Sequence, residues 1–198
     1  MRKHREELRR EATGMTLKKL IAFSKKNDIN RSVAIQVLQN RGGNKDLLLA
    51  VTNFYFYDKF VLQRHRGFGG GLGFLSMDVY PNPQTARSNL NDNEEALLVE
   101  LLLDTGVDVN TRYYYDYTPL MTASFSYIPN RAGKLEILKV LLENGADPNI
   151  KNMQGTTALD IAKKNYAQGQ ERQSQRLIEE LLKDAERNSS SNNLNGGR

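Results

Sequence analysis

The sequence predicts an all-α fold in which pairs of helices stack as repeats into a solenoid. The main observation is a motif that occurs twice, as Gly106–Asn110 (Gly-Val-Asp-Val-Asn) and Gly145–Asn149 (Gly-Ala-Asp-Pro-Asn). Each copy follows a run of leucines that ends in an acidic residue. Each precedes a helix start, at Thr118-Pro119-Leu120 and at Thr157-Ala158-Leu159. Motifs that recur in this order are typical of repeat proteins, which present extended faces for recognition rather than deep clefts.

Local chemistry supports helices on either side of the two motifs. Thr118 can cap a helix through its hydroxyl, and Pro119 suits the first helical position because it has no N–H to satisfy. Gly106 and Gly145 follow leucine-rich segments, at the place where a left-handed residue ends a helix. Helical spacing places one set of leucines on a single face, namely Leu135, Leu138, Leu141 and Leu142.

These motifs resemble the ankyrin repeat, in which an Asp, a Gly and Thr-Pro-Leu-His precede a short helix, a second helix and a Gly-Ala-Asp-x-Asn segment. The resemblance covers about residues 93–186, and a degenerate first repeat extends it back to about residue 45. Met121 and Asp160 depart from the family, which usually has His there, and Asp116 stands where Gly is usual. The resemblance implies about three irregular repeats and a surface that binds a partner protein.

The spacing of the motifs indicates where the repeats are irregular. The motifs begin 39 residues apart, against about 33 in the family. Extra residues fit between the two helices of a repeat, at 127–133 and again at 166–173. A longer insertion, at about 58–92, is expected to split the first repeat into helices near 46–57 and 94–103.

Residues 1–43 are predicted to form a basic helical cap on the repeats. Residues 1–45 contain 12 Lys/Arg and 4 Asp/Glu, whereas the rest of the chain contains 16 and 19. Three interpretations of this charge stay open: a solvated structural cap, a contact for nucleic acid or an acidic membrane, and a targeting sequence. Helices are expected at 1–12 (or a frayed tail), at 16–26 and at 31–40, the last with Asn30 as its N-cap.

The repeats are assigned to residues 44–187, and the last helix is expected to close the stack. Residues 171–187 predict a charged helix that turns an apolar face inward, as a C-terminal cap requires. Residues 188–198 are rich in Ser, Asn and Gly and are expected to form a disordered tail. The residues expected to face inward are Leu177, Ile178, Leu181 and Leu182.

Composition argues against a catalytic site, a metal site and a membrane span. The 198 residues include no Cys and two His, His4 and His65, which are too few for an ordinary structural zinc site and have no recognisable nucleophile elbow nearby. The run Gly67–Gly73 matches neither of the common phosphate-binding loops. No apolar run approaches about 18 residues. We expect no cofactor and no catalytic residue, and an enzyme stays open only with His65 as acid or base.

Localisation follows from the first residues and from the resemblance. The N-terminus lacks the apolar segment of an ordinary secretory signal peptide. We therefore expect a cytoplasmic monomer. Because ankyrin repeats also occur in bacteria that live inside host cells, an effector delivered into a host cell by another route is kept as an alternative.

The tyrosine-rich segment Tyr113–Tyr117 is the best candidate for binding a protein. By the family alignment it lies at the tip of the loop between the first two repeats. Tyrosines there offer a large amphipathic area and lose little rotamer freedom on binding. The alternative is that one or two of them pack inward. The predicted partner-binding residues are Tyr113, Tyr114, Tyr115, Asp116, Tyr117, Phe125, Met153, Gln154, Arg64, Arg66 and Phe68.

Nucleic acid is the alternative partner. Arg64, Arg66 and Phe68 interleave basic and aromatic groups among glycines, and such segments can stack on bases. This hypothesis predicts strong salt dependence and loss of binding when residues 1–15 are removed. The protein-binding hypothesis predicts instead that Tyr115→Ala weakens binding and that salt matters less.

Overall fold

The computed structural model describes residues 2–52, 90–124, 133–166 and 172–195, and every regular element within these ranges is a helix. The all-α prediction is therefore confirmed. A short 3-10 helix, η2 (Tyr114–Asp116), precedes α9. The α-helices are α1 (Arg2–Thr13), α2 (Leu17–Ser24), α3 (Asp28–Arg41), α4 (Asn44–Thr52), α8 (Asp92–Asp104), α9 (Pro119–Ala123), α10 (Gly133–Glu143), α11 (Ala158–Tyr166) and α12 (Arg172–Asn195).

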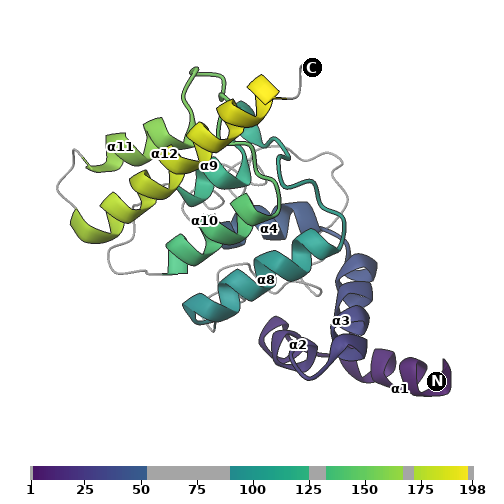
Figure 1. Cartoon of the computed structure of the whole chain (residues 1–198). Coiled ribbons are helices and arrows are strands. Elements are labelled where there is room, and N and C mark those ends of the chain that lie inside the picture. Colours follow the sequence, from purple (N-terminus) through teal and green to yellow (C-terminus); the bar gives the residue numbers. More distant parts are fainter. Residues whose placement is uncertain (1, 53–89, 125–132, 167–171, 196–198) are drawn as a thin grey trace, which may run out of the picture.

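The helices from α4 onward stack in two layers (Figure 1). Helix α10 packs against both α8 and α12, and these three helices form one layer. Helix α9 packs against both α4 and α11, which form the other layer. Helices α4 and α8 also pack against each other, although residues 53–91 separate them in the sequence. The result is the stacked arrangement of helix pairs that a repeat solenoid requires.

The ends of the helices follow the local chemistry that the sequence predicts. The Thr118 hydroxyl accepts a hydrogen bond from the Met121 N–H at 3.3 Å, and Pro119 is the first residue of α9. Gly106 and Gly145, just past α8 and α10, have φ angles of 91° and 85°. Glycine adopts this left-handed region without the steric cost of a Cβ. The helices therefore end where the two motifs begin.

Helices α1 to α3 form a cap at one end of the stack (Figure 1). Helices α1 and α2 pack on α3, while α2 and α3 pack on α8. Helix α3 begins earlier than expected, because its N-cap is Asn27 and not Asn30. The Asn27 side chain accepts the Asn30 N–H at 2.9 Å, and Asn30 itself is buried in the first turn. Both asparagines suit an N-cap by residue type, and the choice depends on where α3 packs.

Helix α12 closes the other end of the stack. Ile178 and Leu182 are buried against the neighbouring helices, whereas Leu177 is 45% exposed. Position 177 lies about 120° around the helix from the middle of the buried pair Ile178 and Leu182, whereas Leu181 lies about 80° away and packs against the core. The inward position predicted for Leu177 is therefore wrong.

The same helix continues to Asn195, past residue 188 where the sequence predicts the start of a disordered tail. Ser189 has contacts that favour this extension. Its hydroxyl donates to the Glu186 carbonyl at 3.2 Å and accepts from Asn149 Nδ2 at 2.5 Å. The division of the chain into cap, repeats, insertion and tail stays a prediction.

One apolar core runs through the cap and the stack, and it contains a polar contact between α4 and α9. The hydroxyls of Thr52 and Thr122 lie 2.8 Å apart, and both residues are buried. Each hydroxyl also lies within hydrogen-bond distance of a carbonyl of its own helix, Leu49 O at 3.1 Å and Pro119 O at 2.8 Å, so the two hydroxyl protons are shared among three contacts. The largest fully buried side chains are Leu20, Ile21, Leu38, Leu48, Leu49, Leu98, Leu101, Leu102, Leu120, Met121, Ile137 and Leu138.

Across the described ranges, none of the helices combines the length and the apolar character that crossing a membrane would need.

Candidate protein-binding surface

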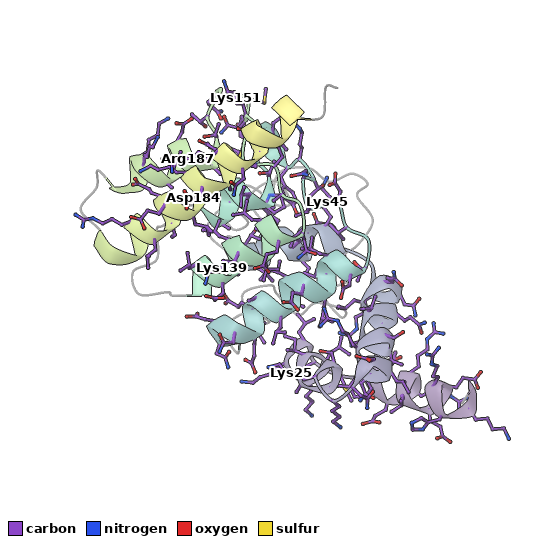
Figure 2. The ribbon with its side chains drawn as sticks, viewed as in Figure 1. Lys25, Lys45, Lys139, Lys151, Asp184 and Arg187 are labelled. Carbon is purple, nitrogen blue, oxygen red and sulfur yellow. The ribbon has the colours of Figure 1, made fainter. Side chains whose placement is uncertain are left out.

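Two neighbouring loops carry the candidate site. The first loop tip (residues 112–117) precedes α9, and the second loop tip (residues 151–156) precedes α11. The Met153 N–H donates to the Tyr115 carbonyl at 3.0 Å, and Arg112 Nη1 donates to the Lys151 carbonyl at 3.5 Å. These two bonds hold the loop tips side by side. Figure 2 shows Lys151 beyond the ends of the helices, on the same side as the C-terminal end of α12.

The first loop tip is a tight turn with two left-handed residues. Tyr115 and Asp116 have φ angles of 57° and 60°. The turn is closed by the Tyr113 N–H, which donates to the Tyr117 carbonyl at 2.9 Å. Arg112 adds an ion pair with the Asp116 carboxylate at 3.4 Å. A left-handed conformation costs an L-residue on the order of 1 kcal/mol, which explains why the ankyrin pattern usually has Gly where this chain has Asp116.

Tyr113 lies against α4 rather than at the exposed end of the tip. Its hydroxyl donates to the Lys45 carbonyl at 2.7 Å, and the Lys45 ammonium lies 5.4 Å from the centre of its ring. Burial, together with the nearby Asp46 carboxylate, raises the pKa of the Tyr113 hydroxyl. This tyrosine therefore connects the loop to the first helix pair.

Tyr117 and Asn152 form the buried side of the site. Tyr117 is half-buried against the core, and burial raises the pKa of its hydroxyl. The Asn152 side chain lowers that pKa. Among the described residues, Asn152 Nδ2 has no hydrogen-bond partner of good geometry. Asn152 Oδ1 accepts from the N–H groups of Gln154 and Thr156, both at 3.0 Å. Asn152 thus gives the second loop tip its shape.

The exposed side of the site is amphipathic. Tyr115 is 49% exposed and Met153 is 70% exposed, and the bond between their backbones places the two residues next to each other. Gln154 and Lys151 are exposed beside them. Aromatic residues, Met and Arg are enriched at the centres of protein interfaces, with polar groups at the rim. The sequence pattern indicated Asn152 as part of the 152–154 loop, but it did not indicate Arg112 or Lys151, because their importance depends on contacts between two loops that are distant in the chain.

The predicted partner-binding residues are distributed unevenly over the structure. Four of them come together at the paired loop tips: Tyr115, Asp116, Met153 and Gln154. Tyr113 and Tyr117 point toward the body of the protein, as the alternative interpretation allowed. Tyr114 has a described backbone only. Phe125, Arg64, Arg66 and Phe68 lie outside the described residues, as do the insertion and His65.

The basic charge of the cap is used in part within the fold. Arg31 Nη2 lies 2.7 Å from an Asp104 oxygen and 3.4 Å from a Glu100 oxygen, and Lys18 lies 3.8 Å from Glu94. All three acidic residues belong to α8. Because the side chains of the Arg31 pairs are more than one-third exposed, each pair contributes at most about 1 kcal/mol to the free energy of unfolding. The cap and α8 are therefore complementary in charge where they meet.

Within the part of the chain that the structure describes, no group of His, Asp and Glu residues is arranged to hold a metal ion. His4 is exposed on α1.

The loops and helices around this site are similar to known proteins. The family model described as ankyrin repeats (many copies) matches residues 102–162, from the end of α8 into α11. A segment of 69 residues is 35% identical to the ankyrin repeat protein L86 of Acanthamoeba polyphaga mimivirus. That match covers 35% of this chain and 12% of the relative.

Proposed function

We propose, from the premise that residues 102–162 of this chain are ankyrin repeats, that the protein binds a partner protein through its paired loop tips. Ankyrin repeats generally mediate contacts between proteins. In this chain the contact would be made by Tyr115 and Met153, with Arg112, Lys151 and Gln154 around them. The helices behind the loops serve as a rigid scaffold.

The observation that carries this proposal is the hydrogen bond between Met153 N–H and Tyr115 O. It joins two exposed apolar side chains from separate loops into one surface. Affinity in such surfaces comes from a few anchors that lose their water on binding, and not from total area. Tyr115 supplies a rigid ring, and Met153 supplies an adaptable side chain that fits irregular surfaces.

The backbone of the first loop tip also supports a functional role. Two successive left-handed residues, Tyr115 and Asp116, persist in a turn that a glycine would form with less strain. Strain of this kind is concentrated at functional sites. The left-handed backbone at Tyr115 therefore supports a functional role for its side chain.

Nucleic acid remains the alternative partner, through the basic residues of α1 and α2. Lys19 on α2 and Lys25 and Lys26 just after it are exposed, and Figure 2 shows Lys25 at the cap. Lys18 and Arg31, by contrast, make ion pairs with α8. We rank this alternative second because part of the basic charge already has acidic partners inside the protein.

The proposed activity is binding without catalysis, as is typical of ankyrin repeats. The contacts of the loop tips bear neither on a role as an effector in a host cell nor on the compartment.

Site-specific photo-crosslinking tests the proposal. A photoreactive amino acid is placed at Met153 in the full chain, and the protein is exposed to nuclease-treated and untreated extract of the cells in which it occurs. The matched control carries the same group at Leu177, which is also a large exposed apolar residue but lies on α12.

We expect Met153 to capture one defined protein that Leu177 does not, and we expect Tyr115→Ala to reduce its yield at least tenfold. Equal capture from both positions would contradict the proposal. Capture that requires intact nucleic acid and falls steeply with salt would move the function to the basic cap.

A further inference from the structure

We infer that the corner between α3 and α4 (residues 39–45) positions the loop tips, so that the junction of the N-terminal cap with the first helix pair sets the geometry of the binding surface. The inference rests on the proposed function, since it concerns the same surface. It assigns Gln39, Asn44 and Tyr113 as positioning residues, which act through the loop and not by touching the partner.

The corner first contacts the loop at its beginning, where α8 ends. Gln39 Nε2 donates to the Thr105 carbonyl at 3.1 Å, and Asn44 Nδ2 donates to the Thr105 hydroxyl oxygen at 3.2 Å. Just before Thr105, the Asp104 carboxylate accepts from Arg31 Nε and Nη2 at 3.1 and 2.7 Å. Residues from α3 and α4 thus fix the point at which the chain leaves α8.

The same corner contacts the loop a second time at its tip. The Tyr113 hydroxyl donates to the Lys45 carbonyl at 2.7 Å, and the Lys45 ammonium lies over the Tyr113 ring. The loop is therefore held by the corner both at Thr105 and at Tyr113. A segment restrained at two points by one rigid corner has little freedom to change direction between them.

The restraint continues into the second loop tip. Tyr115 follows Tyr113 closely, and its carbonyl accepts the Met153 N–H at 3.0 Å. A displacement of Tyr113 from α4 would move this carbonyl and weaken that bond. The hydrogen-exchange rate of the Met153 N–H therefore reports whether the corner fixes the geometry of the loop tips.

Amide hydrogen exchange of the full chain, measured by NMR without any partner, tests the inference. Two variants remove contacts of the corner: Tyr113→Phe, which keeps the ring and removes the hydroxyl, and Gln39→Ala. A third variant, Thr16→Ala, is the control. It removes the side-chain oxygen that accepts the Lys19 N–H at the start of α2, at 3.4 Å, and so changes the cap at a hydrogen bond within α2. The reference amide is Leu138 N–H in the buried part of α10.

We expect Met153 N–H to exchange about fivefold faster in Tyr113→Phe and in Gln39→Ala, as the loss of one hydrogen bond from a local opening equilibrium predicts. Leu138 N–H should change much less, and Thr16→Ala should leave the ratio of the two rates unchanged. The inference is overturned if the Met153 rate does not change, or if it rises by the same factor as Leu138, or if Thr16→Ala has the same effect as Tyr113→Phe.

These results separate the inference from the proposed function. Faster exchange at Met153 with no crosslinked partner would support the positioning role and contradict binding at the loop tips. A crosslinked partner together with an unchanged exchange rate at Met153 would support binding at the loop tips and contradict the positioning role.

Discussion

The buried contact between Thr52 and Thr122 offers a direct test of whether α4 packs on α9 as the first helix of a repeat. Replacing either threonine by valine keeps the shape of the side chain and removes the hydroxyl. The two hydroxyls have two protons for three contacts, so each single variant removes one hydrogen bond, while the other hydroxyl donates to its own helix. With about 1 kcal/mol for each net hydrogen bond, we expect each valine to lower the free energy of unfolding by roughly 1 kcal/mol.

The double variant measures the whole contact. It removes both hydrogen bonds, so its effect should be close to the sum of the two single effects, roughly 2 kcal/mol. Urea unfolding of the four proteins, followed by circular dichroism, gives these differences. The corresponding shift in Tm is about 2–4 °C per kcal/mol for a chain of this size.

A small loss would refute the burial of this contact between α4 and α9. If each valine lowers the free energy of unfolding by no more than a valine at an exposed hydroxyl does, the two threonines are not buried against each other in solution. Thr13→Val is the control for an exposed hydroxyl, because the Thr13 hydroxyl donates to its own helix, at Arg9 O, on an exposed surface. We expect this variant to change stability by less than about 0.5 kcal/mol.

Three further predictions test other features of the fold. Because the pKa of Tyr113 is raised, the folded state keeps the proton of this hydroxyl at pH values where the unfolded state loses it. The free energy of unfolding should therefore fall as pH rises above about 10. Urea titrations at pH 9 and 11 should show a smaller fall of this free energy in Tyr113→Phe. Gly145→Ala should cost about 1 kcal/mol because φ is 85°, whereas Gly14→Ala, which also meets no atom within 4 Å and has no positive φ, should be neutral or slightly stabilising in thermal unfolding. Ile178→Ala should cost about 2–4 kcal/mol and Leu177→Ala less than about 0.5; equal losses in thermal unfolding would show that the face of α12 is assigned wrongly.

Features that depend on neighbouring residues were predicted well from the sequence. The positions of Gly106, Gly145 and Thr118 follow from where a helix needs a left-handed end or a capping oxygen, and these requirements involve only a few residues along the chain. The repeated order of these signals then predicted the fold class. The choice between Asn27 and Asn30 as N-cap was not determined in this way, because two suitable residues lie within one turn.

The exposed side of the loop tips could be predicted only in part. The tyrosine-rich segment was identified correctly as a loop, but its side chains are sorted by contacts that are distant in the sequence. Tyr113 bonds Lys45, which lies 68 positions earlier. Tyr115 lies beside Met153 because the next repeat stacks there. The difference in exposure between Tyr115 and the half-buried Tyr113 and Tyr117 has no signature in residue type, so predicting it requires the three-dimensional arrangement.

The asparagine that ends each motif connects successive units in the stack. Asn110 donates to the Gly145 carbonyl at 3.2 Å and accepts the Asp147 N–H at 2.8 Å, so the first motif bonds the backbone of the second. Asn149 at the equivalent position bonds Ser189 on α12. A helix pair inserted between the first and second units would therefore join them only if its own motif offered a backbone carbonyl and an N–H to Asn110 and brought an asparagine to the unit that follows. Whether a unit can be exchanged in this array therefore depends on the contacts at the junctions between units as well as on the units themselves.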